Sequence, residues 1–233
     1  MRIISRLAQW LFILCLPVLA TTASIGWAVN SSQFYTYRFE KYDVKQSLAE
    51  AGLTLTDSQL KDIATGFIRY FNSSEELIHL TVVQDSQSVE LFNHEEILHF
   101  KDVKGLFRLD YCLLLGTFTY CLIYALASVF WRKGKHRLRL ARSMVAGSIL
   151  TLGLMLLLGI GILLDFDSLF YSFHLISFSN EFWSAVGNML LLFPQGFWFD
   201  AVIYCAIFTA VVALVLGIIG GIYIIKGRRN KRD

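Results

Sequence analysis

The chain has little charge, little proline and no cysteine pattern that could organise a fold. Charged residues make up only 17% of its 233 residues, which include two prolines and four cysteines. The cysteines all fall inside apolar stretches, unlike those of a disulfide framework or a zinc site. The sequence also lacks a P-loop, a G-x-G-x-x-G fingerprint and a G-x-S-x-G elbow, so no motif in it indicates a nucleotide or a serine nucleophile.

Apolar sequence is what the chain has in abundance. Hydrophobic residues account for 55% of it, and the mean hydropathy of +0.54 is too high for a soluble domain of this size. A helix needs about 20 apolar residues to cross the hydrocarbon core of a membrane. Four stretches are long enough: 7–29, 109–131, 144–164 and 199–225. The first also resembles a signal peptide, but its apolar run continues through Val29, which favours a retained helix.

The predicted fold is therefore an all-α membrane protein with a single membrane domain. It is a four-transmembrane-helix bundle with a small extracytoplasmic cap formed by 30–108. Residues 165–198 are rich in aromatic side chains, and 187–198 is too short to span and contains Pro194. This loop is predicted to form an interfacial or re-entrant segment.

Charge is distributed very unevenly along the chain. Segment 165–200 has no Lys or Arg but contains four acidic residues, whereas segment 131–143 has no acid. The basic residues of that loop and of the C-terminal tail are Arg132, Lys133, Lys135, Arg137, Arg139, Arg142, Lys226, Arg228, Arg229, Lys231 and Arg232. The positive-inside rule predicts a multi-pass membrane protein with both termini in the cytoplasm and 30–108 and 165–198 outside. We interpret the basic clusters as topology anchors that attract membrane phospholipid, with no nucleic-acid partner.

Local patterns predict elements within the cap. Segment 35–42 alternates aromatic residues and is predicted to be extended, while Gly52 is expected to end a short helix. Thr56 is the expected N-cap of a helix whose apolar face is Leu60, Ile63, Ala64, Phe67 and Tyr70. Segment 81–91 reads as a strand or hairpin arm. Segment 91–104 is predicted to be helical and to run into the second span, because no proline interrupts it.

The first candidate catalytic group is His99. In a helix, His99 and Asp102 share a face, so Asp102 could orient His99 as a carboxylate orients a general base. Lys104 is close to the outer interface and could polarise an ester carbonyl. The alternative interpretation makes Asp102 and Lys104 solvated charges beside a span.

The second candidate group is His174, which lies among aromatic residues at a predicted membrane edge. Burial would lower its pKa and keep it neutral, as a general base requires, although a purely structural histidine is the alternative. Asn180 could donate its amide to an oxyanion or cap a turn. Trp183 is expected to form a wall of the site.

Three runs together resemble the lipoprotein intramolecular transacylase family. Residues 92–104 (FNHEEILHFKDVK) match a pattern F-N-x-x-E-I-x-H-x-x-D-V-K, and they are followed by 173–183 (FHLISFSNEFW) and 192–198 (LFPQGFW). The four-span layout agrees with this family. One departure concerns 184–188 (SAVGN), where the family pattern has an Asp-Pro and a second Asp, and it affects the positioning of the substrate.

The resemblance implies an acyltransferase of the bacterial cytoplasmic membrane, in Gram-positive bacteria, with its active site at the extracytoplasmic face. No cofactor is expected, because exchanging an ester for an amide needs no energy-rich one. Such an enzyme moves the sn-2 acyl chain of a diacylglyceryl-modified lipoprotein to the α-amino group of its N-terminal cysteine, giving the lyso form. His99 and His174 match the two histidines of the family's motifs, so the resemblance implies that they are the catalytic residues. Asp102, Lys104, Asn180 and Trp183 would support them or bind the substrate.

Two other interpretations stay open at this point. The chain could be a non-catalytic lipid- or lipoprotein-binding partner with the same fold. It could also be a membrane metalloenzyme in which the histidines, Asp102 and Glu95 or Glu96 bind zinc. The absence of an H-E-x-x-H motif favours a site without metal.

Overall fold

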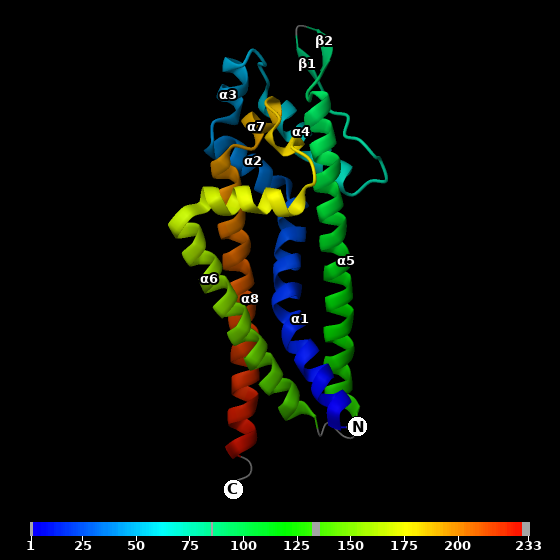
Figure 1. Ribbon diagram of the computed structural model, residues 1–233, viewed down its shortest axis with the longest axis vertical. Coiled ribbons are helices and arrows are strands. Elements are labelled where there is room, and N and C mark those ends of the chain that lie inside the picture. The colour runs from blue at the N-terminus through cyan, green and yellow to red at the C-terminus, as the bar shows by residue number, and fades with distance from the viewer. Residues whose placement is uncertain (1, 85, 132–135, 230–233) are drawn as a thin grey trace. The chain divides into compact units, whose positions relative to one another are not determined.

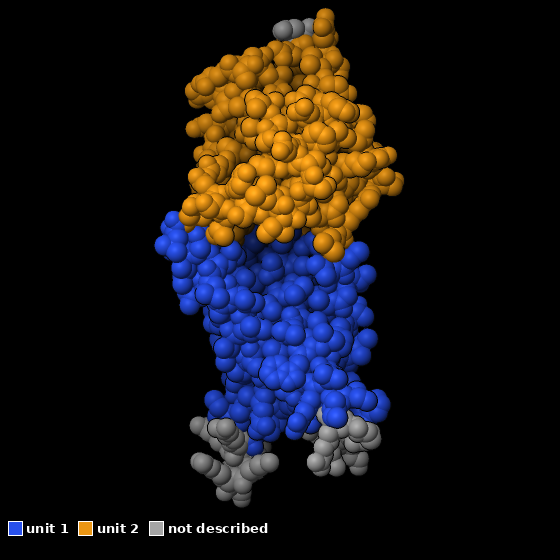
Figure 2. Space-filling model, in the orientation of Figure 1, with its two compact units in different colours: residues 1–25, 110–164, 203–233 blue, residues 26–109, 165–202 orange. Residues whose placement is uncertain are grey.

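The computed structural model describes residues 2–84, 86–131 and 136–229, which form two compact units (Figures 1 and 2). Unit 1 consists of residues 1–25, 110–164 and 203–233, and unit 2 of residues 26–109 and 165–202. The four long helices of the chain each contribute to both units. Predicted basic anchors Arg132, Lys133, Lys135, Lys231 and Arg232 lie outside the described residues.

In the described part of the chain, four helices are long and apolar enough to cross a membrane, which confirms the prediction of four such helices. They are α1 (Arg2–Val29), α5 (His94–Phe130), α6 (Arg137–Ser177) and α8 (Gln195–Arg229). With 37 residues, α5 is about 55 Å long, whereas a hydrocarbon core is about 30 Å thick. Its polar first part, up to Leu109, therefore extends beyond the span and belongs to unit 2.

Unit 1 is a helical bundle in which an apolar cluster and a side-chain hydrogen bond join α1 to α5. Phe12 and Leu16 of α1 form a buried cluster with Cys121 of α5. The Tyr120 hydroxyl donates to the Ala8 carbonyl at 2.7 Å. A polar group within a membrane needs a hydrogen-bond partner in the protein, because the hydrocarbon core provides no donors or acceptors.

Helix α2 (Ser32–Lys41) corrects the prediction that 35–42 is extended. The side chain of Ser31 accepts a hydrogen bond from the Phe34 amide and so caps the helix. The buried residues recur one and four positions apart, which is a helical spacing; they are Phe34, Tyr35, Arg38 and Phe39. The aromatic residues do alternate in the sequence, but the segment folds according to the helical spacing of its buried residues.

The other cap predictions are confirmed. Helix α3 (Val44–Glu50) ends before Gly52, whose φ of +92° lies in the region that glycine tolerates best. Helix α4 (Asp57–Phe71) begins with a complete capping box between Thr56 and Gln59. Strands β1 (Thr81–Gln84) and β2 (Gln87–Glu90) form an antiparallel hairpin with Thr81 opposite Glu90.

An aromatic core around Phe67 joins the cap to the start of α5. The fully buried Phe67 ring lies 5.1 Å from the Phe100 ring and 5.0 Å from the Phe193 ring, measured between centroids. Phe92 packs on Phe100 at 4.7 Å. This core fixes the first turns of α5, on which His99 precedes Phe100.

The segment after the third span enters unit 2 at a kink. Helix α6 has non-helical backbone angles at Asp165 (φ −163°, ψ 88°), after which it continues to Ser177. A 3-10 helix η2 (Phe182–Ser184) and a short helix α7 (Asn188–Leu192) follow, and Pro194 directly precedes α8. Segment 187–198 is thus a short helix and the first turn of a long one.

Candidate active site

His99 is held near the start of α5 by a reciprocal cap. The Asn93 side chain accepts from the Glu96 amide at 3.0 Å, and the Glu96 carboxylate accepts from the Asn93 amide at 2.8 Å. This is the capping-box geometry, with Asn in place of Ser or Thr. One turn later, His99 is buried, with 7% of its surface exposed.

His174 lies near the end of α6 and has a defined tautomer. Its Nδ1 is 2.7 Å from the Phe170 carbonyl oxygen, which can only accept, so Nδ1 carries the proton. In the neutral ring, Nε2 is then left with a lone pair. The ring is enclosed by Phe170 at 4.4 Å, Trp183 at 5.0 Å and Phe178 at 5.6 Å between centroids.

The structure brings the two histidines together. Their ring centroids are 6.3 Å apart, with an interplanar angle of 26°. Phe178 contacts both rings and lies 5.0 Å from His99. Both histidines belong to unit 2, so their pairing is a feature of one compact unit.

Both rings are kept neutral by their surroundings. Burial, together with repulsion by positive charge on His174, lowers the pKa of His99 to about 4, and the Asp102 carboxylate opposes this shift. Burial also lowers the pKa of His174, although the hydrogen bond to Phe170 works in the opposite direction. The site can therefore offer an imidazole base at neutral pH.

Asp102 has a different hydrogen-bond partner from the one predicted. Its Oδ2 accepts from the Asn180 amide nitrogen at 2.8 Å, and the structure gives it no hydrogen bond to His99 among the described residues. The Asn180 carbonyl oxygen in turn accepts from the Phe182 amide at 3.0 Å. Asn180 thus ties α5 to the segment after α6, and Asp102 acts on His99 through its charge.

Lys104 is not a solvated charge, and the hydrogen bonds of its ammonium go to groups outside the histidine pair. It is 2% exposed and donates to the Ser73 hydroxyl at 3.1 Å and the Glu75 carbonyl at 2.7 Å. Its ammonium lies 4.0 Å from the centroid of the Tyr70 ring, and burial lowers its pKa. Lys104 thus links α5 to the turn after α4. Its ammonium is already hydrogen-bonded there, unlike a group free to polarise an ester carbonyl.

Glu96 is a positioning residue, whereas the sequence suggested it only as an alternative zinc ligand. Its side chain is 1% exposed, and its Oε1 accepts from the Met189 amide at 2.6 Å. A side chain at Gly187 would collide with this carboxylate. Asn93 also donates to the Val186 carbonyl at 3.2 Å. The divergent loop 184–188 is thereby attached to the cap of the helix that carries His99, and the N-x-x-E spacing signals the cap but not this attachment.

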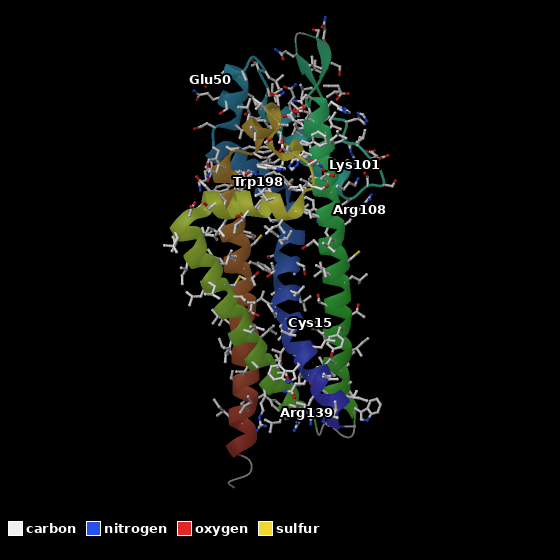
Figure 3. The ribbon with its side chains drawn as sticks, viewed as in Figure 1. Cys15, Glu50, Lys101, Arg108, Arg139 and Trp198 are labelled. Atoms are coloured by element: carbon white, nitrogen blue, oxygen red, sulfur yellow. The ribbon has the colours of Figure 1, made fainter. Side chains whose placement is uncertain are left out.

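A cavity of about 430 Å³ adjoins the histidine pair within unit 2. It shares Phe178 with the pair and is lined by Asp102 and Asn180. Lys101 and Arg108, which Figure 3 shows projecting from α5, also line it. Its remaining lining comes from 75–76, Lys104 and 177–179, together with the backbone after Lys104.

Among the described residues, the other histidines and candidate metal ligands do not form a cluster. His79 and His94 are exposed. Within residues 2–84, 86–131 and 136–229, no three His, Cys, Asp or Glu side chains gather closely enough to hold a metal ion. Glu96, the alternative zinc ligand, uses its carboxylate to accept two backbone amides.

Comparison with known proteins gives a consistent result. The family described as "Lipoprotein intramolecular transacylase Lit" matches residues 10–198. A search of curated proteins finds no match. Among solved structures, the chain resembles the membrane-integral lipoprotein intramolecular transacylase Lit from Bacillus cereus. The TM-score is 0.81 at 17% identity, covering 98% of this chain and 99% of that one.

Two variants of the Bacillus cereus protein, in which one histidine is replaced by arginine or alanine, also match. Their TM-scores are 0.76 and 0.75 at 17% identity, covering 98% and 97% of this chain and 95% and 96% of theirs. Likeness at this identity shows a shared fold, and the family match extends over most of the sequence. The chain therefore belongs to the lipoprotein intramolecular transacylase family and is a membrane-integral acyltransferase.

Proposed function

We propose that His99 and His174 catalyse the transfer of the sn-2 acyl chain of a diacylglyceryl lipoprotein to the α-amino group of its N-terminal cysteine. The observation that carries this proposal is the convergence of two buried, neutral imidazoles, 6.3 Å apart, from distant parts of the chain. The product is a lyso-form lipoprotein with one amide-linked chain and one free glyceryl hydroxyl.

The proton acceptor is His174. A free α-amino group has a pKa near 8, so about a tenth of it is neutral at pH 7 and able to attack the ester carbonyl. As the C–N bond forms, the amine proton moves to Nε2 of His174, whose Nδ1–H is already held by Phe170. A positive charge on His174 disfavours protonation of His99, so the pair accepts one extra proton and carries a single positive charge.

His99 stays neutral and supplies an N–H to the tetrahedral oxyanion. The C–O bond to the glyceryl oxygen then breaks, and the proton held by His174 passes to that oxygen. Ester and amine become hydroxyl and amide with no oxidation or reduction. The exchange of an ester for an amide also needs no energy-rich co-reactant. Holding the amine and the ester together contributes most to the rate enhancement, since effective molarities of about 10⁵–10⁸ M are known for well-oriented intramolecular reactions.

The site is proposed to face the extracytoplasmic side of the membrane. His99 lies near the start of α5, and the basic residues Arg137, Arg139 and Arg142 follow the other end of this helix in sequence. The positive-inside rule assigns those residues to the cytoplasm, together with both termini. The substrate is anchored by its acyl chains, so the enzyme meets it among membrane phospholipids.

Co-expression with a tagged lipoprotein in a bacterial host that lacks this activity tests the function. Mass spectrometry of the lipoprotein N-terminus should find N-acylated lyso product with the wild type and none with His99→Ala or His174→Ala. His94→Ala, an exposed histidine on the same helix, is the matched control and should give full conversion. Unchanged diacylglyceryl-cysteine with the wild type would instead indicate a non-catalytic binding partner.

A further inference from the structure

The cavity beside the histidine pair contains a carboxylate without a matching cation. Charged side chains of both signs line this cavity; they are Glu75, Glu76, Lys101, Asp102, Lys104 and Arg108. Lys101 forms an ion pair with Glu76 at 2.6 Å, and Lys104 donates to Ser73 and to the Glu75 carbonyl. These bonds turn both lysines toward the segment after α4.

Asp102 differs from the two other acidic residues of the cavity, because Glu76 pairs with Lys101 and Glu75 is exposed. In the described part of the chain, no Lys, Arg or His lies within ion-pair distance of the Asp102 carboxylate. Arg108 follows six residues later on α5, which directs it about 120° away around the helix. Asp102 is half-buried, and the neutral amide of Asn180 holds its Oδ2 in place. The carboxylate is therefore fixed but not neutralised.

Its position relative to the histidines is equally specific. Asp102 lies one helical turn after His99 on α5, and its charge acts on that ring. Phe178 and Asn180, which line the same cavity, follow His174 by four and six residues. A cation bound at Asp102 would thus lie beside the imidazole pair.

We propose that Asp102, positioned by Asn180, binds the α-ammonium group of the substrate's N-terminal cysteine. This inference rests on the proposed function, in which that amine is the acyl acceptor. The α-amine is about nine-tenths protonated at pH 7, so the substrate arrives with a cation next to the reacting ester. An ion pair with Asp102 holds the ammonium until it loses one proton to solvent; the neutral amine then attacks the ester and gives its next proton to His174.

A binding measurement separates this role from catalysis. The probe is a dialkylglyceryl-cysteinyl peptide whose ether linkages replace the esters, so that no acyl transfer can occur. Its twin lacks the α-amino group and is otherwise identical. Affinities of purified full-length protein in detergent for the two probes, measured near pH 7, give the preference for the ammonium.

The wild type should bind the amino probe about ten- to a hundredfold more tightly than its twin, the range of a charge-assisted hydrogen bond. Asp102→Asn keeps an acceptor for Asn180 and removes only the charge, and it should abolish the preference. Asp62→Asn, an exposed aspartate on α4, should retain it. Above about pH 9, where the amine is neutral, the wild-type preference should shrink.

Two outcomes overturn the inference: a wild type that binds both probes equally, or an Asp102→Asn protein that is folded by thermal unfolding and still prefers the amino probe. The second arm is the co-expression assay. Lyso product without an amine preference refutes this inference alone. An Asp102-dependent preference without any lyso product refutes the proposed reaction and leaves the amine site in place.

Discussion

His99 and His174 occupy the same aromatic enclosure but are held in different ways. The ring of His174 is oriented by its own helix, through the bond from Nδ1 to Phe170. The Nδ1 atom of His99 is buried without a hydrogen-bond partner among the described residues, and its ring is positioned by packing and by the capped start of α5. A ring with a fixed tautomer suits proton transfer, whereas a ring held neutral by burial suits donation of a hydrogen bond.

The largest expected effect comes from removing the proton acceptor. His174→Gln keeps a polar side chain but cannot take a proton, so the rate of acyl transfer should fall by about 10²- to 10⁴-fold. The rate is measured with a purified diacyl lipopeptide by mass spectrometry, and His79→Gln, at an exposed site, is the control. Retention of more than a tenth of the activity would remove His174 from the role of base.

The same substitution at the other histidine should be milder. His99→Gln retains an N–H donor for the oxyanion, so we expect about a tenfold loss, well short of the loss at His174. His99→Ala removes the donor and should approach the loss at His174. If the glutamine variants ranked in the opposite order, the two roles would have to be exchanged.

Detaching the divergent loop should have an intermediate effect, mainly on stability. Glu96→Ala leaves the buried Met189 amide without its acceptor, which costs about 1–3 kcal/mol of unfolding free energy. Thermal unfolding and limited proteolysis within 184–188 measure this loss. Glu95→Ala, exposed on the same turn, should change neither. A Glu96→Ala protein that is as stable as the wild type and resists proteolysis in this loop would show that the bond from the Met189 amide to Glu96 is not needed to hold the loop.

The smallest effect concerns acid stability. The pKa of His99 is about 4 in the folded protein, against an ordinary value of about 6.5, so only the unfolded chain binds this proton between those values. Its contribution to stability is complete above about pH 6.5 and is lost as the pH falls toward 4. The unfolding temperature of His99→Leu should therefore fall less than that of the wild type when the pH is lowered from about 7 to about 5. An identical loss in both proteins would contradict the assigned shift.

Spans, the helix after Thr56 and the hairpin were predictable because each depends on a local pattern. Segment 35–42 was mispredicted because its alternating aromatic residues also fit a strand. The helical spacing of its buried residues becomes evident only from their packing, such as that of Tyr35 on Phe67. The histidine pair was recognisable from motif and resemblance, and Trp183 does contact His174. The bonding of Lys104 to the segment after α4, and that of Glu96 to 187–189, depend on residues far apart in sequence. No local pattern contains that information.

The most direct test follows one acyl chain through the reaction. Purified protein receives an equal mixture of two diacyl lipopeptides that differ in peptide mass, one of which carries an isotope-labelled sn-2 chain. Tandem mass spectrometry should find the label on the α-nitrogen of its own peptide with the wild type, and no transfer with His174→Ala. Label on both peptides, or undiminished transfer by His174→Ala, would contradict an intramolecular shift catalysed by the histidine pair.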